Sequence, residues 1–365
     1  MRLQHPRRKC SILNVAMSGP MRASVVVVTY NHRTIISRCL SALSATLGPN
    51  DEVIVVDNAS CDGTADDVAR CLPWVYVMRC DANAGFGAGC NRGARNAQGR
   101  YLVFLNPDTE PQAGWLDALL AGLRAAPDAG LATGKLLLAR AADRIDAFGN
   151  EVHISGITTS RGWGEPAVRY DRIEEVSAVS GACFAVRRDT FERLGGFDER
   201  LFLYFEDTDL SLRARLAGLR CVAVPDALVL HDHRPGFSAV KLRYLERNRW
   251  WTLFKLLEWR TIVALTPVLL VAEILAWGMA LRGGPGSLIG KALAWTEFVG
   301  WLPELRQART AARANRMIRD SELLARHGAR LPLSQLADGA DMRGVESFCE
   351  RLFAAARRMT VAIAP

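Results

Sequence analysis

The chain has 365 residues, a formal net charge of +8, 50% hydrophobic residues and 23% charged residues. These values exclude a disordered, fibrous or low-complexity protein, and they allow one large domain with a smaller appendage, or two domains. The nine cysteines form no Cys-x-x-Cys pair, so neither a disulfide framework nor a zinc site is predicted. No signal peptide is predicted, and we expect a reducing, cytoplasmic environment.

Short apolar runs alternate with helical patterns through the first third of the sequence. Strands are predicted at 24–31, 51–57, 75–79 and 101–105, and helices at 33–45, 64–71 and 115–126. The valine run before Thr29 has no polar alternation, which is typical of a strand covered on both faces. Further strands are predicted at 176–186, 219–224 and 227–230. The alternation predicts an α/β fold with a doubly wound, mostly parallel sheet flanked by helices.

Polar residues follow three of these strands, in the groups Thr29–Asn31, Asp57–Ser60 and Asn106–Asp108. Because α/β sheets bind ligands at the carboxyl ends of their strands, these groups are candidates for a ligand site. Asp57 can accept hydrogen bonds from a base or a ribose, or it can form a turn. Asp108, together with diphosphate oxygens, can hold Mg²⁺ or Mn²⁺.

Other segments also carry candidate chemistry. The glycine-rich stretch Asn83–Gly93 precedes a helix and fits either close approach of a phosphate or a structural turn. A predicted helix opens with the acids Glu206, Asp207 and Asp209. Such acids complement the helix dipole or, when crowded in a cleft, supply a general base. His231 and His233 follow a strand and are either ligands of a metal or diphosphate, or solvated loop residues.

The order of these motifs resembles family 2 glycosyltransferases of the GT-A fold, and most closely their rhamnosyltransferase-like branch. The motifs are VVVVTYN, VVDNAS, NAGFGAGCNRG, LNPD, GACFAVRRDTFERLGGFDERLFLYFEDTDLSLR and HRPGFS, in register over about residues 22 to 250. The resemblance implies an inverting transferase that uses a nucleotide-diphospho-sugar. It fixes neither the sugar nor the acceptor.

The resemblance also assigns roles to individual residues. The nucleotide-sugar-binding residues would be Thr29, Asn31, Asp57, Asn83, Gly85, Asn91 and Asn106. Asn106 stands where the family's D-x-D motif has its first acid, so Asp108 would bind Mg²⁺ or Mn²⁺, with His233 as a second ligand. Asp207 would deprotonate the acceptor hydroxyl, with Glu206 as the alternative base.

The branch resemblance implies dTDP-L-rhamnose as the donor and a hydroxyl of a cell-surface glycan or polyprenyl-linked precursor as the acceptor. The alternatives are a UDP-sugar-dependent transferase of the same family and a catalytically silent sugar-nucleotide-binding protein. Nucleic acid is not expected as a partner, because the late arginines lie outside the strand-end groups and no aromatic residues interleave with them.

The chain changes character after about residue 240. Thr261–Leu281 is nearly continuously apolar with Glu273 near its middle, and Leu288–Leu302 is a second apolar run. A stripe along one helix face is predicted for Arg306, Arg309, Arg313, Arg316 and Arg319.

These features predict a poorly ordered extension at 1–21, a GT-A catalytic domain at 22–240 and a helical C-terminal region at 241–365. We expect the C-terminal region to dock on the cytoplasmic face of the inner membrane, where basic residues contact anionic lipid. An acid inside the longer apolar run favours an in-plane or re-entrant arrangement over a single span. The alternative is an apolar helical pair that covers the catalytic core.

Overall fold

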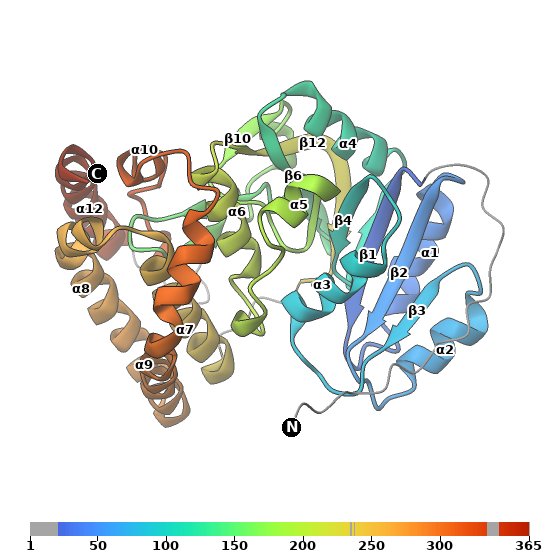
Figure 1. The fold of residues 1–365 in the computed structure, drawn as a ribbon, viewed down its shortest axis with the longest axis horizontal. Helices are drawn as coiled ribbons and strands as arrows, with labels where there is room; N and C mark the ends of the chain where they lie inside the picture. Colours follow the sequence, from blue (N-terminus) through green and yellow to red (C-terminus); the bar gives the residue numbers. More distant parts are fainter. Residues whose placement is uncertain (1–20, 234–235, 237, 334–342, 365) are drawn as a thin grey trace.

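The computed structural model describes residues 21–233, 236, 238–333 and 343–364 (Figure 1). The predicted extension at 1–21 therefore lies outside the described residues except for Met21, which is buried. The chain forms a sheet-centred α/β part with a group of C-terminal helices beside it, as Figure 1 shows. This arrangement confirms the predicted fold class.

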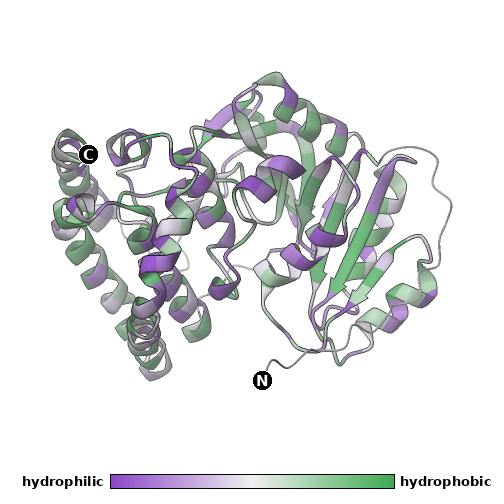
Figure 2. Ribbon diagram, in the orientation of Figure 1, coloured by the Kyte–Doolittle hydropathy of each residue, from purple (hydrophilic) through white to green (hydrophobic). Residues whose placement is uncertain are grey.

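The first four strands form the parallel half of a ten-stranded sheet. They are β1 (Ala23–Thr29), β2 (Asp51–Asp57), β3 (Tyr76–Arg79) and β4 (Tyr101–Leu105). β1 pairs in parallel with β2 and β4, and β2 pairs in parallel with β3. Figure 2 shows β1 and β2 in the hydrophobic colour. Val25 and Val27 pack into one core and Val26 and Val28 into another, because successive side chains of a strand point to opposite faces.

Helices cover both faces of the sheet. The face of Val25 packs against α1 (Ile36–Thr46), α2 (Thr64–Cys71) and α4 (Trp115–Ala125). The face of Val26 packs against α3 (Phe86–Asn96), α5 (Arg188–Arg193) and α6 (Glu206–Leu216). Leu40 and Trp115 are fully buried in the first core. Burial of a large apolar side chain stabilises a fold by roughly 1.5–3 kcal/mol, so this packing holds the strand ends in place.

The remaining strands complete the sheet in the order β10-β12-β6-β11-β4-β1-β2-β3. They are β5 (Thr109–Pro111), β6 (Ala129–Leu138), β7 (Ala141–Ala147), β10 (Glu174–Val176), β11 (Cys183–Arg187) and β12 (Arg220–His231). β11 runs antiparallel between β4 and β6. A separate antiparallel hairpin pairs β8 (Asn150–Val152) with β9 (Thr158–Ser160).

The strand bounds predicted in the second half of the sheet were wrong. The predicted strand 176–186 is split into β10 and β11, because the chain between them leaves the sheet. Ser180 and Gly181, in this connecting segment, line a cavity. The predicted strands 219–224 and 227–230 are one strand, β12, with a register shift between Val224 and Leu228. Pro225 lies within this shift, where its missing N–H costs no ladder hydrogen bond.

The C-terminal helices are α7 (Ala239–Leu256), α8 (Trp259–Arg282), α9 (Pro285–Arg313), α10 (Asp320–Ala325) and α12 (Arg343–Ile363). They pack with α6 around a third core, and α9 lies mainly along α7. The predicted arginine stripe was wrong. α9 ends at Arg313, so Arg316 and Arg319 lie beyond it. Arg309 is buried, and its guanidinium donates to the Phe254 carbonyl.

Glu273 lies in a polar cluster between α7, α8 and α9, which accounts for an acid within an apolar run. Its carboxylate accepts from Nε1 of Trp295 at 2.6 Å and pairs with Nζ of Lys291 at 2.9 Å and Nη2 of Arg249 at 3.4 Å. Lys291 also pairs with Glu246. Buried charges are costly unless they are paired, so this cluster faces the inside of the helical group.

The outer face of α8 carries apolar side chains instead. The exposed ones are Val263, Leu270, Ile274 and Leu281. On α9, Ile289 and Leu293 are exposed as well. Within the described residues, α8 is the helix that is long and apolar enough to cross a membrane, judged by length and composition.

Candidate active site

A cavity of about 690 Å³ opens at the carboxyl ends of β1 and β4 and beside the first turn of α6. The predicted site residues that line it are Thr29, Asn83, Gly85, Asn106, Asp108, Glu206, Asp207 and His233. Asp108 and Asp207 come from positions far apart in the chain, and the fold brings them to one cavity. The wall between them includes Ser180 and Gly181, from the segment that separates β10 from β11.

Three predicted nucleotide-sugar-binding residues, Asn31, Asp57 and Asn91, lie outside this lining. The side chains of Asn31 and Asn91 are engaged elsewhere. Asn31 accepts from the Cys61 amide at 2.9 Å through its side-chain oxygen. Asn91 donates through Nδ2 to the Phe197 carbonyl and to Glu199, both at 2.9 Å, and accepts from the Phe197 amide through Oδ1. The structure therefore does not bring Asn91 to the cavity. Its side chain instead stabilises the loop before α6.

Unpaired polar atoms gather where β1 and β2 end. Thr29 and Asp57 are partners in the parallel register of these strands. Within the part of the chain that the structure describes, the buried atoms Oγ1 of Thr29, Oδ1 of Asp57 and Nδ1 of His32 have no hydrogen-bond partner. A buried polar group left unpaired costs about 1–3 kcal/mol, which a polar ligand would recover. The other Asp57 oxygen accepts from the Ser60 amide at 3.1 Å, so this residue also forms the turn that the sequence allowed.

The glycine-rich stretch is shaped by close backbone contact. Gly85 has φ +91° and precedes α3, and a Cβ there would lie 2.2 Å from the Phe202 carbonyl oxygen. The Phe86 amide donates to that same oxygen at 2.7 Å. Asn58 adds side-chain hydrogen bonds to Oδ1 of Asn83 at 2.9 Å and to the Gly85 carbonyl at 3.0 Å. The requirement for glycine at position 85 is therefore explained by a structural turn. Gly85 also forms part of the cavity wall.

Asp207 is held by hydrogen bonds from three directions. Its Oδ2 accepts from the Gly181 amide at 2.7 Å and from Nδ2 of Asn150 at 3.2 Å, and its Oδ1 accepts from the Thr208 amide at 2.6 Å. Burial raises the pKa of Asp207 above its ordinary value. A carboxylate that is fixed in orientation and made more basic has the properties of a general base.

The neighbouring acids differ from Asp207. Burial raises the pKa of Glu206 to about 8, with the nearby charge of Asp207 adding to the effect. Glu206 is 4% exposed, and one of its oxygens has no hydrogen-bond partner. Asp209 is fully buried and pairs with Arg213 at 2.8 Å and Lys255 at 2.6 Å. Glu206 is therefore protonated at neutral pH, while Asp209 ties α6 to α7.

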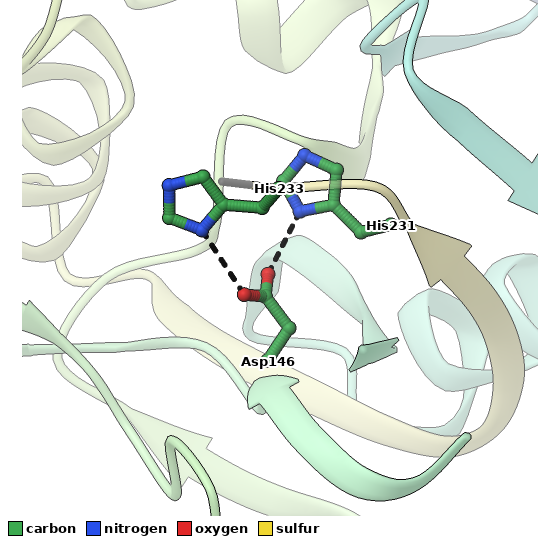
Figure 3. Close-up of side chains that lie close together, drawn as sticks. All are labelled: Asp146, His231 and His233. Carbon is green, nitrogen blue, oxygen red and sulfur yellow. Dashed lines mark hydrogen bonds and ion pairs between the residues drawn. The ribbon is translucent and has the colours of Figure 1, made fainter. Parts of the chain in front are cut away.

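The Asp146 carboxylate meets two imidazoles at the cavity wall (Figure 3), and the Asp108 carboxylate lies beside one of them. Nδ1 of His231 lies 2.7 Å from Oδ2 of Asp146, and Nδ1 of His233 lies 3.1 Å from Oδ1 of Asp146. Nε2 of His231 lies 3.3 Å from Oδ1 of Asp108. One ligand atom from each of Asp146, His231 and His233 falls within 4.8 Å of the others. Oxygen and imidazole nitrogen donors of this kind suit a divalent cation.

The charges in this cluster reinforce one another. Burial alone would lower the pKa of His231, but its hydrogen bonds with Asp108 and Asp146 raise that pKa to about 9. Burial would raise the pKa of Asp146, but its hydrogen bonds with His231 and His233 lower it to about 2. His231 is thus held between two carboxylates that favour its charged form.

Asp146 and Asn150 were not singled out from the sequence. Asp146 is the last residue but one of β7 and Asn150 starts β8, both within a stretch without strand or helix periodicity. Asn58 belongs to the candidate group Asp57–Ser60 and Gly181 opens the motif GACFAVRR, but neither was given a role of its own. No local signal marks Asp146 and Asn150, because only their long-range contacts distinguish them.

The mostly parallel sheet, the cavity at its strand ends and the helical region beside it are those of a GT-A-type glycosyltransferase. Residues 24–195 match the family model "Glycosyl transferase family 2". N-acetylglucosaminyl-diphospho-decaprenol L-rhamnosyltransferase of Mycobacterium tuberculosis is 33% identical over 231 residues, which cover 57% of this chain and 75% of that protein. The chain belongs to glycosyl transferase family 2, within which its sequence is rhamnosyltransferase-like. It is therefore a glycosyltransferase.

Solved structures show the same fold. The structure of S. aureus TarS 1–349 in complex with UDP-GlcNAc has a TM-score of 0.52 at 18% identity, covering 93% of this chain and 92% of that one. That of GalNAc-T7 with UDP, GalNAc and Mn²⁺ has a TM-score of 0.56 at 17% identity, covering 80% and 58%. At these identities the likeness concerns the fold.

Proposed function

We propose that this protein is an inverting transferase that moves L-rhamnose from dTDP-L-rhamnose to a hydroxyl of a lipid-linked glycan. The observation that carries the proposal is the position of Asp207, whose fixed carboxylate lines the same cavity as Asp108 and His233. The choice of rhamnose and of a lipid-linked acceptor is supported by the likeness to the mycobacterial enzyme, whose name gives both.

The donor nucleotide would bind at the ends of β1 and β2. Thr29 and Asp57 each have a buried oxygen that is free to accept from a base or a ribose. Asn83 and Gly85 would border the donor from the start of α3, and Asn106 from the end of β4. Asn31 shapes this end indirectly through its bond to the Cys61 amide.

The diphosphate would lie at the cluster of carboxylates and imidazoles. Asp108, Asp146 and His233 would hold Mg²⁺ or Mn²⁺ there, since all three line the cavity and oxygen and nitrogen donors fit either ion. Asp146 and His233 belong, with His231, to the group whose ligand atoms lie within 4.8 Å of one another. Such a cation, when bound, neutralises charge on the leaving diphosphate. His231, fixed between Asp108 and Asp146, keeps the two carboxylates in place.

Asp207 would act on the acceptor. Its carboxylate takes the proton of the acceptor hydroxyl as that oxygen attacks the anomeric carbon. The bond between the anomeric carbon and the diphosphate oxygen breaks as the new glycosidic bond forms on the opposite face, so the configuration inverts. Gly181 and Asn150 orient the carboxylate toward this reaction. Glu206, being protonated, adds no second negative charge beside it.

The proposal assigns catalysis to residues 22–240 and membrane docking to residues 241–365. The exposed apolar stripe of α8 would lie in the cytoplasmic leaflet of the inner membrane. An in-plane arrangement is favoured over a span, because the charged cluster around Glu273 ties α8 to α7 and α9. Exposed Arg260 and Arg282, at the two ends of α8, would contact anionic lipid.

A donor panel tests the proposal. The purified chain is given dTDP-L-rhamnose, UDP-GlcNAc, UDP-glucose or GDP-mannose with Mg²⁺ or Mn²⁺ and a lipid-linked N-acetylglucosaminyl diphosphate, and transfer to the lipid is measured. We expect transfer from dTDP-L-rhamnose to exceed the others by at least about tenfold. Preference for a UDP-sugar would overturn the assignment of dTDP-L-rhamnose as the donor. The absence of turnover with every donor would favour a catalytically silent sugar-nucleotide-binding protein.

A further inference from the structure

A second cavity, of about 230 Å³, adjoins the catalytic cavity. The walls of both cavities include Thr158, Thr159, Ser160, Phe205, His233, Lys241 and Leu245. The hydroxyl of Thr158 lies 3.4 Å from that of Thr208, the residue next to Asp207. One end of the second cavity therefore lies close to the proposed base.

The rest of this second cavity is apolar. Its own wall, between α7, α8 and the segment after α10, includes Leu242, Leu275, Ala276, Met279, Leu331 and Leu333, and Ile157 and Trp163 also line it. Glu246 and Arg249 also border it, but they pair with each other at 2.7 Å. Their charges are thus satisfied within the protein. A cavity of this character binds a hydrocarbon group better than a sugar, because the apolar side chains among its described lining residues cannot replace the hydrogen bonds that sugar hydroxyls make with water.

The other end of the second cavity reaches the helix that bears the exposed apolar stripe. Ala276 and Met279 of α8 form part of the wall. Ile274 and Leu281 of the same helix are 69% and 65% exposed. Ile274 and Leu281 lie on the opposite face of α8 from Ala276, so a hydrocarbon chain that passes this helix would meet an apolar surface suited to a lipid layer.

We propose that the second cavity binds the first isoprenoid units of the lipid-linked acceptor. The inference rests on the proposed function and names the part of the acceptor that this region recognises. A sugar hydroxyl at Asp207, a hydrocarbon chain between Leu242 and Met279, and a membrane beside α8 then lie in one continuous path. Lys241 lines both cavities, at the point where the diphosphate joining sugar and chain would pass.

Binding to the full-length chain tests the inference without turnover. Farnesyl diphosphate and inorganic diphosphate are compared as ligands by calorimetry. We expect farnesyl diphosphate to bind at least about tenfold more tightly, because its chain leaves water. Met279→Trp, which fills the cavity, should remove this difference. Ile274→Trp, on the exposed side of the same helix, is the matched control and should keep it.

Equal affinity of the wild-type protein for the two ligands, or an unchanged difference in Met279→Trp, would overturn the inference. A photoreactive farnesyl diphosphate analogue provides a readout that depends on no variant. Labelling of the wild-type chain within residues 242–245 or 275–279 supports the proposed position, and labelling confined to other segments contradicts it.

Transfer kinetics separate this inference from the proposed function. If the farnesyl ligand binds and labels as expected but no donor is transferred to a lipid-linked acceptor, the cavity assignment stands and the proposed reaction fails. If transfer proceeds with the same KM for the lipid acceptor in wild type and Met279→Trp, the reaction stands and the cavity assignment fails.

Discussion

The Gly181 amide donates a 2.7 Å hydrogen bond to Oδ2 of Asp207, a residue 26 positions later in the chain. Gly181 sits where the chain leaves the sheet between β10 and β11, and Asp207 is in the first turn of α6. The pair joins the central sheet to that helix at the cavity. It also leaves Asp207 as a buried carboxylate with a fixed orientation, whereas the adjacent Glu206 is protonated at neutral pH.

Asp207→Asn is expected to lower kcat by about 10²–10⁴-fold, because the amide cannot take the acceptor proton. The KD for the donor should change by less than about threefold, since Asp207 acts on the acceptor. Glu206→Gln is the matched control: it replaces a protonated carboxyl by an amide of similar shape and should keep most activity at pH 7. Full transfer activity in Asp207→Asn would rule out its role as the base.

Asp146→Asn is expected to weaken cation-dependent donor binding by about 10–100-fold, because Asp146 holds both His231 and His233. Calorimetry of donor binding with and without Mn²⁺ measures the effect. Asp143→Asn is the control on the same strand, since Asp143 is exposed and pairs with the neighbouring Arg144 at 3.5 Å. If Mn²⁺ enhances donor binding equally in Asp146→Asn and wild type, Asp146 takes no part in holding the cation.

Leu270→Glu combined with Ile274→Glu is expected to reduce binding to anionic vesicles by at least about tenfold, because the two acids interrupt the apolar stripe of α8. Sedimentation with phosphatidylglycerol-containing vesicles measures the bound fraction. Val168→Glu alters a residue that is 84% exposed in the catalytic part and should leave binding unchanged. Wild-type protein that stays in the supernatant would contradict the membrane proposal itself.

Two buried histidines predict a loss of stability in acid. Burial lowers the pKa of His153 to about 4 and that of His327 to about 3. The unfolded chain takes up these protons near pH 6.5 but the folded chain does not, so the free energy of unfolding should fall as pH drops from about 6.5 toward 4. Each histidine contributes about 1.4 kcal/mol per pH unit there.

Chemical denaturation at pH 7, 6 and 5 checks this sign. His153→Phe removes one titrating group and keeps an aromatic ring against Phe353, whose ring centroid lies 4.4 Å from that of His153. The pH slope of the unfolding free energy should be smaller in this variant than in wild type. An equal slope in the two proteins would show that His153 does not titrate on unfolding.

Much of the fold could be predicted because its signals are local. The valine run of β1 predicted a strand that is covered on both faces, and β1 is buried along its whole length. The helix predicted at 115–126 is α4. Asp108 and Asp207 could be proposed as neighbours from motif order, and they line one cavity. Asn91 was expected there as well, but its side chain is used by the loop at Phe197, a contact that no local pattern announces.

The sequence by itself determined the chemistry that is available: acids and amides after buried strands, histidines at and just after the end of β12, and apolar runs behind the catalytic part. Local periodicity and residue type carry that information, because they depend on neighbours along the chain. Only the tertiary structure decided that Asp146 joins His231 and His233, that Asn150 and Gly181 orient Asp207, and that an apolar cavity leads from there to α8. These relationships depend on distances between residues remote in sequence, which packing of the three cores sets.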